Sequence, residues 1–325
     1  MTTSAKLPSP PQKVVDGWMP CGSIGYIVEV IPHNKAITTP GFLGGWGWIM
    51  TMLAAGSITA GAQNAPLTDK SGYNLFNPVP ENLMRDLSPD RPDETESAYT
   101  VDAGHYQLEL DFVNFTFDKS GGTTTKAWEV GDFNFKVGLL NNMDFQMVYD
   151  NYLNVETRDS SGETTTQSGF GDFTTRLKIN LWGDDGGTTA FALLPYVKFP
   201  TATDNLGKNA VEGGVILPLA VSLPHDFDLS METAAGLFHD ENDNRYHEEF
   251  IASASLDHPI VGKLSGFLEF FSNFSTERHT GWVGTVDTGL EYLVTKNIQL
   301  DCDCYFGVTP AAPDFNPFCG ITVRF

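Results

Sequence analysis

The stretch "GDFNFKVGLLNNMDFQMVYDN", residues 131–151, holds two runs in which apolar and polar side chains alternate, joined by two asparagines. A period of two places successive side chains on opposite faces of a β-strand. The apolar set of the two runs is Phe133, Phe135, Val137, Leu139, Met143, Phe145, Met147 and Tyr149. The stretch therefore predicts two antiparallel strands with one apolar and one polar face.

The same alternation recurs from Gly104 to the last residue in about 12 segments, most of them about ten to fourteen residues long. Strands of that length exceed the usual five or six residues of globular strands. Capped segments with a period of 3.6 residues are absent from this part of the sequence. We therefore expect an all-β fold.

The connections alternate in length. Longer polar loops are expected at 118–125, 155–168, 200–211, 239–246, 275–281 and 309–314, and shorter links at 141–142, 183–188, 224–226, 257–262 and 295–297. Short periplasmic turns and longer extracellular loops are typical of outer-membrane barrels, whose closure pairs every backbone group. The sequence thus predicts a closed antiparallel up-and-down transmembrane β-barrel of about 12 strands with both termini periplasmic. A soluble secreted β-sandwich with inverted faces is the alternative.

Composition narrows the classes of function. The 19 basic and 41 acidic residues give a formal charge of -22, which repels nucleic acid. Residues 42–56 form an apolar stretch followed by Ala60-Gly61-Ala62, which indicates a signal peptide with cleavage near Gln63. We expect residues 1–62 to be an N-terminal extension and signal peptide, 63–103 a periplasmic segment, and 104–325 the barrel of a Gram-negative outer membrane.

A family resemblance begins ahead of the first strand. The run Asp90-Arg91-Pro92-Asp93-Glu94-Thr95-Glu96-Ser97, followed by Gly104 and Gln107-Leu108-Glu109, resembles the opening of the bacterial family labelled MetA-pathway of phenol degradation. Residues 169–181 and 192–202 are similar to two further family segments. The resemblance covers about residues 86–325 and implies an outer-membrane barrel that passes small, often aromatic, compounds. It implies no catalytic residue.

The charged run is the first candidate site. Asp90, Arg91, Pro92, Asp93 and Glu96 are expected to form a periplasmic latch or partial plug, in which Arg91 pairs with carboxylates at the lumen mouth. The alternative is a solvated turn that begins at Pro92. We favour the packed role.

The second candidate site is the polar face, which a membrane barrel turns inward. The expected solute path comprises Asp132, Lys136, Asp144, Arg176, Lys178, Lys198, Asp287 and Glu291. Acids outnumber bases on this face, which favours cations or neutral solutes over anions. The alternative is that these charges pair with one another and select nothing.

Other chemistry is not favoured. His247 with Ser253 or Ser255 is the best candidate for a phospholipase site, but six or eight residues along one strand is too far for contact. The loop 239–249 lacks the spacing of a calcium site. A cross-strand bond between Cys304 and Cys319 is conceivable if the last turn centres near 311–312, but Cys302, Cys304 and Cys319 are expected to be small apolar residues that face lipid. We expect no enzyme, cofactor or metal.

The chain ends in "FCGITVRF", an alternating row whose last residue is Phe325. We interpret Phe325 as the signal read by the outer-membrane assembly machinery and the last strand as the one that closes the barrel. The predicted function is an outer-membrane channel or transporter for small solutes. The alternatives are a structural barrel with a filled lumen, a soluble secreted protein and a phospholipase. Expected partners are outer-membrane lipid, lipopolysaccharide, the assembly machinery and a small-molecule solute.

Overall fold

The computed structural model describes residues 69–240, 244–278 and 280–325. The predicted extension and signal peptide, 1–62, with its cleavage near Gln63, lies outside the described residues. Within them, one short 3-10 helix, η3 (Glu81–Leu83), precedes the strands. No helix among the described residues is long and apolar enough to cross a membrane.

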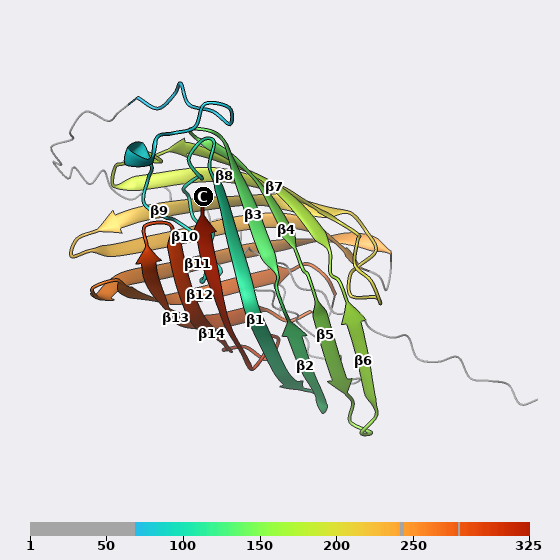
Figure 1. The fold of residues 1–325 in the computed structure, drawn as a ribbon. Coiled ribbons are helices and arrows are strands. Elements are labelled where there is room, and N and C mark those ends of the chain that lie inside the picture. The colour runs from blue at the N-terminus through green and yellow to red at the C-terminus, as the bar shows by residue number, and fades with distance from the viewer. Residues whose placement is uncertain (1–68, 241–243, 279) are drawn as a thin grey trace, which may run out of the picture.

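One antiparallel sheet of fifteen strand segments makes up the rest. The segments are β1 (Tyr106–Ser120), β2 (Thr123–Glu129), β3 (Phe133–Leu140), β4 (Met143–Tyr149), β5 (Leu153–Arg158), β6 (Thr164–Gly169), β7 (Phe173–Trp182), β8 (Thr189–Phe199), β9 (Glu212–Leu223), β10 (Phe227–Asp240), β11 (Arg245–Val261), β12 (Leu264–Ser275), β13 (Val283–Thr295), β14 (Ile298–Gly307) and β15 (Phe315–Arg324). The last segment pairs with the first, so the sheet closes on itself (Figure 1).

Three strands of the wall are interrupted. The pairs β2 and β3, β4 and β5, and β6 and β7 are each one bent strand, because β1 pairs with both β2 and β3 and the next strands follow the same break. The fifteen segments therefore form a twelve-stranded closed barrel, as the sequence predicted. Beyond the break, β2, β5 and β6 extend past the rest of the wall (Figure 1).

The two ends of the barrel differ. At the proximal end, β1 begins and β15 ends, and Tyr106 and Phe325 exchange both backbone hydrogen bonds at 2.8 and 2.9 Å. The longest connections, 200–211, 276–282 and 308–314, lie at the distal end. The expected loop 118–125 is wrong, because the strands continue to a two-residue turn at Gly121–Gly122, both with positive φ. β-branched threonines at 123–125 favour the strand that replaces it. The compartment that each end faces stays a prediction.

The outward face is apolar and the inward face is mostly polar. Large apolar side chains such as Leu268, Phe274 and Leu290 are half or more exposed to the surroundings, whereas the charged residues between them are buried inside. This arrangement is the reverse of a soluble β-sandwich and excludes that alternative.

The inward face is not polar throughout. On β8–β12 an apolar cluster lies in the middle and distal part of the lumen, formed by Leu194, Ile216, Ala234, Phe238, Ile251 and Phe271. A second cluster, Ala127, Leu153, Val155 and Leu206, packs the loop 200–211 against β2 and β5. The polar-inside rule that we drew from 131–151 is therefore wrong for these strands, whose sequences carry apolar residues on both faces.

Candidate functional site

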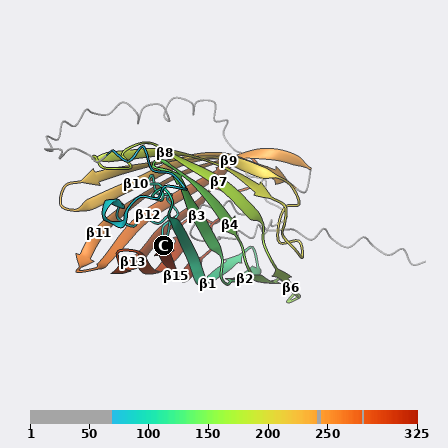
Figure 2. The ribbon, with the colours of Figure 1, turned by 45° about the horizontal axis from the view of Figure 1, so that its top comes forward.

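The interior of the barrel contains part of the chain itself. Residues 84–103, which we call the inner segment, lie within the ring of strands near the proximal end (Figure 2). They bond to inward side chains of β1, β3, β7, β10, β12 and β14. Gly138 lets the inner segment approach β3, because a Cβ there would come 2.0 Å from the Asp102 carbonyl oxygen.

Arg91 of the inner segment bonds to two strands of the wall. Its guanidinium donates to Asp111 of β1 and to Asp301 of β14, each at 2.6 Å. Between them, β15 places Gly320 directly beneath the guanidinium, where a Cβ would lie 2.1 Å from Nη2. Arg91 thus connects the two strands on either side of the closing strand by charge-assisted hydrogen bonds.

Asp90 is held by two lysines. Its carboxylate lies 2.5 Å from the ammonium groups of both Lys136 on β3 and Lys178 on β7, and all three side chains are buried. Burial would raise the pKa of Asp90, but the two ammonium groups outweigh it and hold the pKa below its usual value. Lys136 also binds Glu109.

Glu96 completes this side of the lumen. It pairs with Arg176 of β7 and lies 3.8 Å from Lys178. Burial and the neighbouring Asp90 raise the pKa of Glu96 to about 7, against the opposing effect of the bases. We call Lys136, Arg176 and Lys178 the basic wall.

The opposite side of the lumen presents carboxylates. Glu269 on β12 accepts hydrogen bonds from the Glu94 amide at 2.7 Å and from the Thr95 hydroxyl, and Glu232 on β10 accepts one from the Glu96 amide at 2.8 Å. We call the inward carboxylates of β10–β13 the acidic wall, comprising Asp228, Glu232, Asp257, Glu269, Asp287 and Glu291. Burial and these carboxylates raise the pKa of Glu94 well above its usual value.

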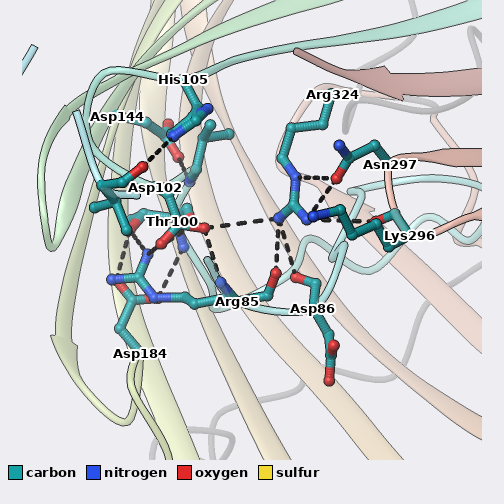
Figure 3. A network of polar contacts seen from close by, with 12 residues as sticks. Arg85, Asp86, Thr100, Asp102, His105, Asp144, Asp184, Lys296, Asn297 and Arg324 are labelled. Atoms are coloured by element: carbon teal, nitrogen blue, oxygen red, sulfur yellow. Dashed lines mark hydrogen bonds and ion pairs between the residues drawn. The ribbon is translucent and has the colours of Figure 1, made fainter. Parts of the chain in front are cut away.

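A polar network closes the proximal end (Figure 3). The backbone amide of Arg85 donates to Asp102 at 3.0 Å, and the Thr100 amide donates to Asp184 at 3.0 Å. Arg324 of β15 donates to the Arg85 carbonyl and to Asn297, both at 3.0 Å. Arg85, Asp102 and Asp184 were not among the predicted site residues, because they lie outside the strand pattern.

The predicted path residues all project inward, and each of the eight has a protein partner. Lys136, Arg176 and Lys178 bind the inner segment, and Lys198 lies 2.5 Å from Glu212. The carboxylates also accept hydrogen bonds: Asp144 from the Val101 amide, Asp132 from the Asn151 amide, Asp287 from Thr285 and Glu291 from Ser265. Their role in a solute path stays a prediction.

The predicted latch residues lie together in the lumen. Asp90, Arg91 and Glu96 make the ion pairs described above, and the Pro92 carbonyl accepts a 2.6 Å hydrogen bond from Tyr305. Asp93 is hydrogen-bonded to Ser255 and lies beside Glu269 and Asp257. Their role as a latch stays a prediction.

The remaining candidates do not form a reactive site. His247 bonds to Glu249, Ser253 to Thr95 and Ser255 to Asp257, so the residues weighed for a phospholipase have different partners. Part of the loop 239–249 lies outside the described residues. Within the described ranges, no group of three or more histidine, cysteine, aspartate or glutamate side chains is arranged to hold a metal ion.

The expected cysteine register is wrong, and so is the expectation that the cysteines are only small lipid-facing residues, because two of them form a disulfide. Cys302, not Cys304, lies opposite Cys319 and is disulfide-bonded to it, whereas Cys304 lies opposite Pro317 and is free. β14 ends at Gly307 and β15 begins at Phe315, with Phe306 opposite Phe315. The turn therefore centres one residue earlier than expected, which moves every partner by two.

A cavity of about 760 Å³ lies between the inner segment and the inward faces of β9, β10, β11, β13 and β14 at the proximal end. It is lined by residues of the inner segment, the 183–188 turn and the acidic wall. Such a volume is within the range of small-molecule sites.

Comparison with known proteins agrees with this architecture. The family model described as MetA-pathway of phenol degradation matches residues 89–325, and the chain belongs to that family. Among solved structures, the COG4313 outer membrane channel from Pseudomonas putida F1 is similar, with 12% identity, a TM-score of 0.53, and coverage of 72% of this chain and 99% of that one.

Two further structures have lower scores. The transport unit of the autotransporter AIDA-I from Escherichia coli has 10% identity and a TM-score of 0.48, covering 74% of this chain and 93% of that one. The NanC porin has 12% identity and a TM-score of 0.43, covering 66% of this chain and 98% of that one. No curated protein matches the chain in sequence. The fold is that of an outer-membrane channel-like barrel.

Proposed function

We propose that this protein is a channel of the Gram-negative outer membrane that passes small solutes through its lumen. The observation that carries the proposal is the proximal cavity, which lies inside a closed barrel with an apolar outer face and borders the acidic wall. Family membership and the likeness to an outer membrane channel support it. The function needs neither an enzymatic site nor a cofactor.

The test is conduction by the purified full-length protein. Reconstituted into planar bilayers, it should give discrete current steps, and in liposomes it should allow small solutes to enter. A protein that inserts into both and gives neither current nor flux would contradict the proposal.

Aromatic or other hydrophobic compounds are the proposed solutes. The family description refers to phenol degradation, and the inward apolar cluster around Phe238 and Phe271 offers contacts that a purely charged lumen would lack. Faster liposome uptake of phenol-sized compounds than of sugars of equal size would support this choice. Equal rates would count against it.

A structural barrel with no transport is the second candidate. It is favoured by the position of the inner segment and by Tyr305, whose hydroxyl bonds to the Pro92 carbonyl in the lumen. The same recordings decide between the two. A variant without residues 84–103 that conducts while the intact protein is silent would favour the structural role.

Phe325 is the proposed assembly signal. It ends the closing strand, stacks on Tyr106 with ring centroids 6.0 Å apart and is 58% exposed. The proposed partners are the assembly machinery, outer-membrane lipid and lipopolysaccharide. Deleting Phe325 should reduce the amount inserted in cells more than the stability of the inserted protein. Normal insertion without it would contradict this role.

A further inference from the structure

The basic and the acidic side chains around the proximal cavity differ in their partners. The basic side chains that line it all have partners: Lys70 and Arg85 bind Asp185, Arg91 binds Asp111 and Asp301, and Arg324 binds Asn297. Carboxylates line the cavity as well, and four of them are Asp93, Asp228, Asp257 and Glu291. In the part of the chain that the structure describes, none of these four has a basic group within 4.0 Å, and the side-chain partners of Asp93, Asp257 and Glu291 are serines.

Two of these carboxylates face each other directly. Asp228 on β10 and Asp257 on β11 are cross-strand neighbours in register. Like charges in that position destabilise a sheet. Burial beside Glu269 and Asp257 also raises the pKa of Asp93 well above its usual value. A cation in the cavity would relieve both the repulsion and the cost of ionising Asp93.

A second observation is independent of the acids. Gln299 on β14 lines the cavity and is only 6% exposed. Among the described residues its Nε2 donor has no hydrogen-bond partner. A buried amide donor without an acceptor is costly, so the cavity offers a place for a ligand oxygen.

We propose that the proximal cavity binds a small organic ammonium compound that also carries a hydroxyl or carbonyl oxygen. The ammonium group would lie among Asp228, Asp257 and Glu291, and the oxygen would accept from Gln299. A cavity of about 760 Å³ suits an organic molecule rather than a bare ion. The inference rests on the proposed channel function, because the cavity lies where a solute would enter or leave the lumen.

The test is calorimetric titration of the full-length protein in detergent with three compounds of equal length. The probe is 4-amino-1-butanol, and the controls are 1,4-butanediol and 4-hydroxybutyrate. The amine should bind saturably, and the neutral and anionic analogues should not. Equal binding of all three, or no binding of the amine, would overturn the proposal.

Variants locate the site. Replacing Asp257→Asn and Glu291→Gln together should weaken amine binding by about tenfold for each charge removed. The control Asp226→Asn removes a charge from the exposed turn before β10 and should leave the affinity unchanged. An unchanged affinity in the double variant, or an equal loss in the control, would overturn the assignment.

The variant Gln299→Leu tests the contact with the ligand oxygen separately from the contact with the ammonium group. It should lower the affinity for 4-amino-1-butanol but not for butylamine, which lacks the oxygen. An equal loss for both compounds would contradict the role of Gln299. Current recordings on the same preparation test the two proposals separately. Conduction without amine binding would contradict only the amine site. Amine binding without conduction would contradict only the channel function.

Discussion

The two sides of the lumen hold the inner segment in different ways. On the basic wall, the ammonium groups of Lys136 and Lys178 form ion pairs with the Asp90 carboxylate. On the acidic wall, Glu232 and Glu269 accept hydrogen bonds from the Glu96 and Glu94 backbone amides. One wall therefore binds charged side chains of the inner segment, whereas the other supports its backbone.

The largest effect should follow from breaking the basic wall. Lys178→Met leaves the buried Asp90 with one lysine in place of two, and removing one partner of a buried ion pair costs about 3–5 kcal/mol. The free energy of unfolding, measured by urea titration in detergent, should fall by that order. The matched control Lys126→Met lies on an exposed part of β2 and should change it by less than about 1 kcal/mol. Equal losses would contradict the comparison.

A smaller loss is expected from Arg91→Lys. Lysine keeps the charge but cannot donate in a fork to Asp111 and Asp301. We expect about 1–3 kcal/mol, the cost of leaving buried acceptors unsatisfied. The readout is the temperature at which the folded band shifts on a detergent gel. A variant that shifts at the wild-type temperature would show that the connection across β15 contributes little.

The acidic wall should tolerate the reciprocal change. Glu269→Gln keeps an oxygen for the inner segment and removes one charge from a crowded group of carboxylates. Lost hydrogen bonding and relieved repulsion oppose each other, so the unfolding free energy should change by less than about 1 kcal/mol. A loss as large as that of Lys178→Met would mean that the two walls do not differ.

A change of pH should have the smallest effect on the docking of the inner segment. Asp93 and Glu94 have raised pKa values in the docked inner segment, and the pKa of Glu96 is about 7. The docked state therefore binds more protons than a released one, and docking is lost as the pH rises through these values. Asp90 has a lowered pKa and stays charged throughout this range. Hydrogen-exchange protection of the Glu94 and Glu96 amides, corrected for intrinsic rates, should fall from about pH 6 to about pH 8. A rise would contradict the sign.

The fold could be predicted because a barrel repeats one simple rule along the chain. Alternation at 131–151 and its recurrence determined the strands, and the closing role of the last strand followed from its pattern. The alternation placed the bases Lys136, Arg176 and Lys178 on the inward face of the sheet. It could not show that they form ion pairs with Asp90 and Glu96. Those partners lie outside the strand pattern, and Asp90 is 88 residues from Lys178.

Two signals in the sequence could have located the inner segment more closely. Gly138 and Gly320 interrupt inward rows of side chains, and each marks a close approach of the inner segment to the wall. The cysteine register could not be determined, because it depends on the centre of the 308–314 turn to within one residue. The apolar cluster on β8–β12 was missed because the inward positions in that part of these strands are apolar, as the outward ones are.

Ion selectivity decides whether the acidic wall borders the conducting path. The protein should be reconstituted in a planar bilayer with a tenfold gradient of potassium chloride, and the reversal potential of single channels should be recorded. If the acidic wall lines the path and the basic wall is neutralised by the inner segment, the reversal potential will have the sign of cation selectivity. Anion selectivity of the intact protein would contradict this account.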